Sequence, residues 1–171
     1  MKRTSFSQMS CSIARTLDLI GEWWTLLILR DIFFGVRRFE ELLENLGVSR
    51  KVLTDRLDTL VSGGILERRS YQHRPERYEY WLTEKGLELY PVLLVLMQWG
   101  DRWMAEQGAP IEILHSTCGH LTRPVVTCIQ CGEELNVHNV QTRPGPGLSV
   151  NEAAVLQSLI AQNETGKKRG S

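Results

Sequence analysis

The chain has 171 residues, of which 42% are hydrophobic and 23% charged, and its 20 Lys and Arg residues balance its 20 Asp and Glu residues. These values are ordinary for a globular protein with one main core, and they exclude wholesale disorder. The longest apolar run, residues 92–97, is too short to cross a bilayer as a helix, and no apolar signal segment follows the basic start, so we expect a cytoplasmic protein without a membrane partner.

The charges are unevenly distributed along the chain. Residues 49–77 hold seven basic and four acidic residues, whereas residues 78–171 hold seven basic and ten acidic ones. The positive field is therefore local to one segment, which favours an anionic partner such as DNA at that place.

Two helices are predicted before this segment. Apolar residues recur at helical spacing from Cys11 until Gly21, and residues 22–34 are so rich in large apolar side chains that this second helix must be mostly buried. Gly35 is its expected C-cap.

The next two helices are short and joined by a turn. One apolar stripe runs over residues 39–46 and stops at Gly47, and a second, made of Leu53, Leu57 and Leu60, follows the N-cap candidate Ser49. The spacing predicts two helices with a turn at residues 45–49.

Alternating apolar and polar residues then predict a hairpin over residues 65–82, with a turn around Pro75. Thr83 is expected to cap one long helix to Gly108, with a kink at Pro91. The predicted fold is mainly α with a small β-hairpin wing, a winged helix-turn-helix domain. Residues 92–103 carry more apolar surface than one domain can cover, so we expect a homodimer.

In such a domain the recognition helix, residues 49–61, enters the major groove of double-stranded DNA and the wing meets the minor groove or the backbone. Placing the leucine stripe inward turns Lys51, Thr54, Asp55 and Asp58 outward. The two aspartates are evidence against DNA binding unless they accept a cytosine amine or point away. The predicted DNA-binding residues are Arg37, Arg38, Ser49, Arg50, Lys51, Thr54, Arg56, His73, Arg74 and Arg77.

These motifs resemble the HxlR-type family of bacterial winged-helix regulators. An early Cys, then W-T-L-L-I-L-R, R-R-F-x-E-L, V-L-T-D-R-L and Y-x-L-T-E-K-G occur in this order over about residues 10–108, and only Glu22-Trp23 departs from the pair usual at that position. The resemblance implies a dimeric transcription factor whose first and last helices build the dimer, with two recognition helices on adjacent half-sites. In some family members a Cys at the start of the first helix senses electrophiles or oxidants, so Cys11 is a redox candidate; the alternative is a small apolar residue at the dimer interface.

The segment after the domain contains the pattern H-x2-C-x9-C-x2-C, formed by His115, Cys118, Cys128 and Cys131. Two donor pairs, each followed by Gly, match the knuckles of a zinc ribbon with short strands at Val125, Val126, Leu135 and Val137. Four protein ligands would leave no open position, so the zinc site would be structural. The alternatives are unliganded thiols, or His120 as the fourth donor.

The predicted organisation is a DNA-binding and dimerisation domain at 1–108, a zinc-ribbon-like β segment at 109–140, and a flexible linker and tail at 141–171 with one or two helical turns near residues 151–160. The leading hypothesis is that the protein is a transcriptional regulator, either a repressor or an activator, which binds a pseudo-palindromic operator. A small-molecule effector is a further candidate partner. A protein-interaction module and a redox sensor working through Cys11 or the Cys/His cluster are the alternatives. We expect no enzyme, because no catalytic triad or phosphate loop stands out.

Overall fold

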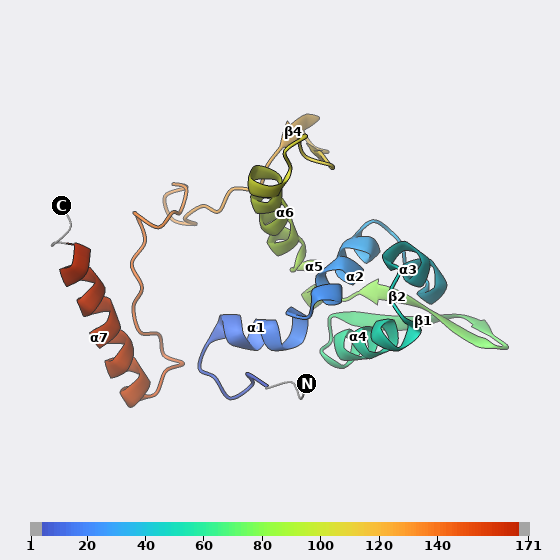
Figure 1. Ribbon diagram of the computed structural model, residues 1–171, viewed down its shortest axis with the longest axis horizontal. Helices are drawn as coiled ribbons and strands as arrows, with labels where there is room; N and C mark the ends of the chain where they lie inside the picture. The colour runs from blue at the N-terminus through green and yellow to red at the C-terminus, as the bar shows by residue number, and fades with distance from the viewer. Residues whose placement is uncertain (1–4, 168–171) are drawn as a thin grey trace. The chain divides into compact units, whose positions relative to one another are not determined.

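The computed structural model describes residues 5–167, which fall into two compact units that meet in the sequence between Pro124 and Val125 (Figure 1). The first unit contains α1 (Ser12–Ile20), α2 (Trp23–Phe33), α3 (Phe39–Leu46), α4 (Arg50–Ser62), β1 (Leu66–His73), β2 (Glu76–Leu82), α5 (Glu84–Leu87), α6 (Tyr90–Met104), β3 (Ile113–His115) and β4 (His120–Thr122). The second contains α7 (Val150–Lys167). The prediction of a mainly helical fold with a β-hairpin is confirmed.

The core lies where α2 packs between the other helices of the first unit. Ile28 and Leu29 of α2 are completely buried, as are Leu53, Leu57 and Leu60 of α4. The leucine stripe of α4 therefore faces inward as predicted, and this leaves the remaining faces of α4 available to solvent. The prediction that this helix is mostly buried holds for one face of α2, which contributes Ile28, Leu29 and Ile32 to the core, whereas Trp23 is 89% exposed and Phe34, just after the helix, is 57% exposed.

A tight turn joins α3 to α4. Gly47 ends α3 in the left-handed conformation, with φ of 63°, and donates its N–H to Leu43 O at 3.0 Å. A side chain at this φ would be strained, which explains why glycine stops the apolar stripe here. Ser49 then caps α4, so the two helices form the predicted helix-turn-helix.

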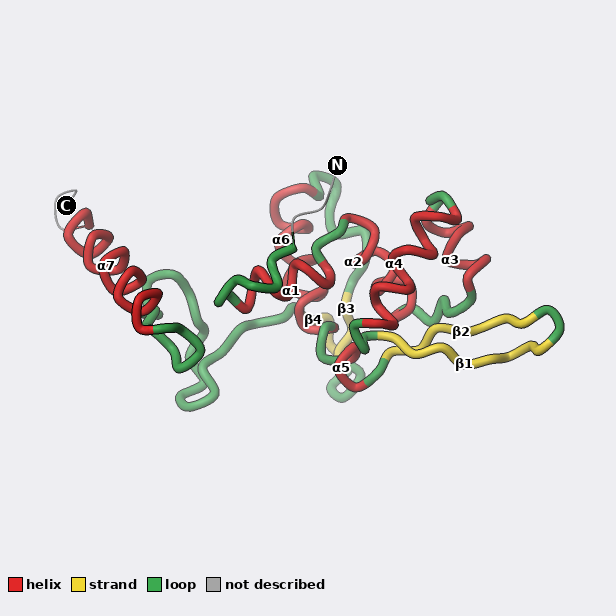
Figure 2. The backbone as a smooth tube through the Cα atoms, turned by 90° about the horizontal axis from the view of Figure 1, so that it is seen from below, coloured by secondary structure: helices red, strands yellow, loops and turns green. Residues whose placement is uncertain are grey.

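The wing is the antiparallel pair β1–β2, which extends beyond α3 and α4 as a long ribbon (Figure 2). The register pairs Leu66 with Leu82 at the base and His73 with Glu76 at the tip, with an irregularity between Ser70 and Gln72. At its base, Tyr80 N donates to Arg37 O at 2.9 Å. The segment before α3 thus holds the wing against the helices.

The prediction of one long helix after the wing is wrong, because the chain forms two separate helices, α5 and α6, there. Thr83 Oγ1 accepts the N–H of Gly86 at 3.1 Å and donates to Gly64 O at 2.7 Å, so the first turn is held against the end of α4. Pro91 lies in the first turn of α6, where its missing N–H costs nothing. Pro91 therefore helps to start a new helix instead of kinking a continuous one.

The segment after α6 forms the short hairpin β3–β4, which pairs His115 with His120. Among residues 125–140 the structure contains an isolated bridge between Thr127 and Glu134, without the strands expected around them. The tail helix α7 is longer than the expected one or two turns. Ser149 Oγ accepts from Glu152 N at 3.3 Å while Glu152 Oε2 accepts from Ser149 N at 2.8 Å, a capping box that starts α7.

None of the helices within residues 5–167 has the length and apolar character needed to cross a membrane.

Candidate nucleic-acid interface

The exposed start of α4 carries the side chains predicted to read DNA. Ser49 Oγ accepts a hydrogen bond from Val52 N at 3.3 Å, so Ser49 serves as the N-cap of the helix. Lys51 in the first turn of α4 and Thr54 in the second are both exposed. Because the positive end of the helix dipole lies at the same place, this end of α4 is suited to phosphates and base edges.

Arg50, the first residue of α4, is held by a carboxylate from α3. Its Nη1 donates to Glu40 Oε1 at 2.9 Å and its Nη2 donates to Glu40 Oε2 at 2.7 Å, while both side chains remain exposed to solvent. This hydrogen bonding holds the pKa of the Glu40 carboxyl below its ordinary value, and the charge of Arg77 adds to the shift. The same contact raises the pKa of Arg50. Both groups are therefore ionised near neutral pH.

The two aspartates that weighed against DNA binding are each paired with a cation. Lys51 Nζ lies 3.2 Å from Asp55 Oδ2, one helical turn away. Asp58 receives a hydrogen bond from Arg68 of β1. The carboxylates reduce the positive field of this face but do not stand as isolated negative charges.

Arg56 is directed toward the segment between α1 and α2. Its Nη1 lies 3.7 Å from Glu22 Oε1, and only 22% of its side chain is exposed. Arg56 would have to leave Glu22 to reach a phosphate.

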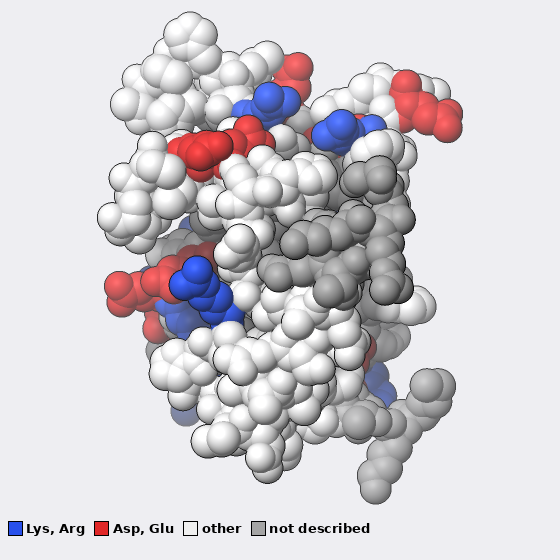
Figure 3. All heavy atoms as spheres, turned by 90° about the vertical axis from the view of Figure 1, so that its left-hand side faces the viewer, with Lys and Arg blue, Asp and Glu red and all other residues white. Residues whose placement is uncertain are grey.

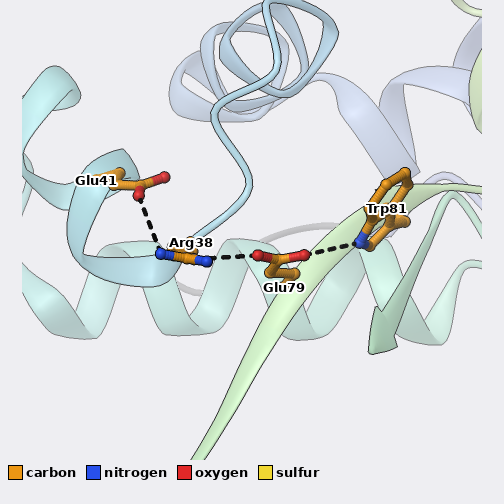
Figure 4. A network of polar contacts seen from close by, with 4 residues as sticks. All are labelled: Arg38, Glu41, Glu79 and Trp81. Carbon is orange, nitrogen blue, oxygen red and sulfur yellow. Dashed lines mark hydrogen bonds and ion pairs between the residues drawn. The ribbon is translucent and has the colours of Figure 1, made fainter. Parts of the chain in front are cut away.

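A polar network fixes the base of the wing (Figure 4). Arg38 Nε donates to Glu79 Oε1 at 3.0 Å, and its Nη1 lies 4.0 Å from Glu41 Oε1. Trp81 Nε1 donates to the other oxygen of Glu79 at 3.4 Å. The hydrogen bond to Glu79 raises the pKa of Arg38. The network connects α3 to β2 and so sets the position of the wing relative to the helix-turn-helix.

Trp81 also stacks with two guanidinium groups. The Cζ atom of Arg37 lies 3.4 Å from the ring centroid, and that of Arg69 lies 4.4 Å from it. Sequence reasoning missed Glu79 and Trp81 as organisers of the interface. Their spacing of two residues on a strand, which places both on one face, was the available signal.

The tip of the wing presents its cations to solvent. His73, Arg74 and Arg77 are all exposed there, and Gln72 Nε2 donates to Arg74 O at 3.0 Å. The predicted wing residues thus lie at the end of the ribbon that extends from the helices (Figure 2). Figure 3 draws acidic and basic side chains of the described residues in small groups among uncharged ones.

Each of the two Cys/His knuckles forms a tight turn that ends in a left-handed glycine. In the first, Gly119 has φ of 71°, and His115 Nδ1 lies 3.3 Å from Cys118 Sγ. In the second, Gly132 has φ of 75° and donates to Cys128 O at 2.8 Å. These are the local turns that the motif predicts.

The second knuckle stabilises a thiolate. Hydrogen bonds from the backbone of Cys131 and Gln130, together with the Cys131 side chain, lower the pKa of Cys128. Within residues 5–167, however, no three His, Cys, Asp or Glu side chains lie close enough together to hold a metal ion. Zinc binding and the identity of its fourth donor, His115 or His120, stay predictions.

Cys11 is half-buried at the N-cap position of α1, where its side chain makes no capping hydrogen bond. All four cysteines have free thiols in this structure.

Comparison with known proteins gives a consistent result. A sequence profile described as HxlR-like helix-turn-helix matches residues 19–108. The uncharacterized HTH-type transcriptional regulator Rv3095 of Mycobacterium tuberculosis is 49% identical over 144 residues, which cover 84% of this chain and 91% of that protein. This similarity is long enough to extend beyond the winged domain.

Two solved structures are also similar. PA1607, a proposed transcription factor, is 31% identical with a TM-score of 0.74, and the match covers 83% of this chain and 100% of that one. The oxidized form of the redox regulator HypR is 33% identical with a TM-score of 0.50, and the match covers 54% of this chain and 96% of that one.

Proposed function

The chain belongs to the HxlR-like helix-turn-helix family and is an HTH-type transcriptional regulator, and we propose that it binds a pseudo-palindromic operator in double-stranded DNA as a homodimer. The observation that carries this proposal is the exposed, cationic start of α4 beside a wing whose tip bears further cations.

In the proposed complex, α4 enters the major groove with its N-terminus first. Arg50, Lys51 and Thr54 then meet base edges or the nearest phosphates, and the amides after Ser49 face a phosphate. The wing tip lies along the adjacent minor groove or backbone. Arg37 and Arg38, at the base of the wing, contact the backbone and set the register without reading sequence.

The dimer is proposed to form through α6 together with α1. Residues Val92, Val95, Leu96, Trp99 and Trp103 recur every three or four positions along α6, and each of their side chains is between 39% and 65% exposed. This spacing makes one continuous apolar stripe, which is more surface than a stable monomer usually leaves in water. Ile13 and Leu17 of α1 are likewise exposed and one helical turn apart. A second copy of the chain is the proposed partner of this surface.

The test is binding to a duplex recovered by in vitro selection from a random library. Replacing Arg50 and Lys51 together with Ala should weaken binding by about 2–6 kcal/mol, at about 1–3 kcal/mol per good contact. Arg123→Ala with Arg143→Ala removes the same charge from exposed positions outside α4 and the wing and should have little effect. Equal affinity of the wild type and the Arg50/Lys51 variant at fixed salt would contradict the proposed binding mode.

We further propose that His115, Cys118, Cys128 and Cys131 bind one zinc ion. Each knuckle supplies two donors of the kind that zinc prefers from one tight turn, and hydrogen bonds within the second knuckle lower the pKa of Cys128. Apolar side chains of this segment are unusually exposed, such as Ile129 at 95% and Val137 at 73%. So small a segment with so little burial is stabilised most readily by a metal, which would supply a structural cross-link and no chemistry.

A redox-sensing role through Cys11 is the second candidate, supported by the half-exposed thiol and by the structural similarity to the redox regulator HypR. Diamide would accept the two electrons and two protons released when Cys11 thiols of two protomers form a disulfide. A diamide-induced, reducible crosslink that is absent from Cys11→Ser would support this role, and its absence from the wild type would exclude that disulfide.

A further inference from the structure

The pairing of Arg50 with Glu40 leaves part of the guanidinium group available. The carboxylate binds the end of the guanidinium group, since it takes one hydrogen from Nη1 and one from Nη2. Arg carries five N–H donors in a planar fork, so three remain. Two of these, Nε–H and the neighbouring Nη–H, form the side edge of the fork, and Nε has no hydrogen-bond partner among residues 5–167. Glu40 therefore fixes Arg50 while a complete two-donor edge stays free.

The position of this edge suits base recognition. Arg50 is the first residue of α4, 66% of its side chain is exposed, and its Cζ lies 5.7 Å from the ring centroid of Phe39. A guanidinium with two adjacent N–H donors matches the O6 and N7 acceptors of guanine in the major groove. A side chain already held in one geometry loses less conformational entropy when it binds.

Glu40 also opposes the competing use of Arg50. In a loose complex on arbitrary DNA, a free arginine at this place would swing to a phosphate, because phosphates supply most of the non-specific affinity. That movement would break the pair and leave the Glu40 carboxylate beside the phosphate backbone. A guanine contact through the free edge needs no such movement.

We propose that Glu40 is a positioning residue that presents Arg50 to guanine and thereby determines specificity at one base of each half-site. This inference rests on the proposed DNA-binding function and adds a base and the side chains that select it. Glu40 acts through Arg50 and does not itself contact the base.

The experiment compares duplexes recovered by in vitro selection with derivatives in which each guanine is replaced in turn, and with a shuffled duplex. For the wild type, one guanine per half-site should matter by roughly tenfold or more, and Arg50→Ala should abolish this dependence. Glu40→Gln should reduce the discrimination at the same base several-fold, leave the other bases unchanged, and bind the shuffled duplex at least as tightly as the wild type does.

Two comparisons separate positioning from a general charge effect. Glu44→Gln makes the same charge change at another exposed position of α3 and should preserve the discrimination. In the Arg50→Ala background, Glu40→Gln should cause no further change at that base. Thermal melting confirms that each variant is folded.

The possible failures are distinguishable. Discrimination that survives in folded Glu40→Gln, or a wild type whose selected sequence has no guanine dependent on Arg50, overturns the role of Glu40 alone. A wild type that enriches no sequence at all overturns the proposed function.

Discussion

The proposed dimer is tested most sharply by a charge in the middle of the α6 stripe. Leu96 is 50% exposed and lies between Val92 and Trp99 on the same face. Burying a whole Leu side chain is worth about 1.5–3 kcal/mol, so covering the exposed half contributes roughly 1 kcal/mol per protomer. Leu96→Asp removes this term and places an ion in an apolar interface, at a further cost of several kcal/mol.

A symmetric dimer contains the substitution twice. Even a total of about 6 kcal/mol raises the dimer dissociation constant roughly 20,000-fold. Light scattering and sedimentation across a range of concentrations should therefore show a monomer for Leu96→Asp, with helix content preserved by circular dichroism. Gln107→Asp, which adds the same charge at an exposed position just after α6, should stay dimeric. A soluble Leu96→Asp dimer with the wild-type dissociation constant would refute the assignment of this stripe.

Three further results are expected. Gly86→Ala would place a Cβ 2.3 Å from Ile65 O. Relieving this clash should cost about two or three hydrogen bonds, so urea unfolding should show that the free energy of unfolding falls by roughly 2–3 kcal/mol. An unchanged urea midpoint would contradict this close approach. Protein purified without added metal should contain about one zinc per chain, lost in Cys128→Ser with Cys131→Ser, and metal-free wild type with a protease-resistant segment would oppose the zinc proposal. Arg50 lowers the pKa of the Glu40 carboxyl, so Glu40 stays ionised at pH values below those at which a free Glu side chain becomes protonated. Guanine discrimination should therefore be constant between about pH 5 and 8. A decline within that interval would implicate a histidine instead.

The helix-turn-helix could be predicted from the sequence because its signals are local. The α4 stripe of Leu53, Leu57 and Leu60 is completely buried, Ser49 caps the helix, and Gly47 ends α3 in a conformation that favours glycine. Apolar periodicity, helix caps and helix-ending glycines each depend on only a few neighbouring residues. Such local preferences can be read from the sequence, and here they agree with the final fold.

The break between α5 and α6 was not predictable in the same way. Thr83 was correctly expected to cap a helix, but its hydroxyl also bonds to Gly64 O, 19 residues away. That contact depends on the end of α4 being close by, which the sequence does not show. The capping box of Ser149 and Glu152, by contrast, was a local signal that predicts the start of α7.

The sequence predicted the candidate DNA-binding side chains as exposed cations, but it did not predict which carboxylates they pair with. The bidentate pair of Arg50 and Glu40 joins residues ten positions apart on different helices, and the pair of Arg38 and Glu79 joins residues 41 positions apart. Such pairs arise only when the helices and the wing are packed together. These pairs fix the directions in which the arginine side chains point.

The most direct test of the central claim is a DNA footprint of the wild-type protein on the duplex recovered by selection. A dimer that reads a pseudo-palindrome should protect two half-sites on one face of the duplex, about 10 base pairs apart from centre to centre. The protection should be lost when Arg50 and Lys51 are both Ala. Failure to enrich any sequence, or uniform protection that the Arg50/Lys51 variant retains, would contradict sequence-specific binding through the start of α4.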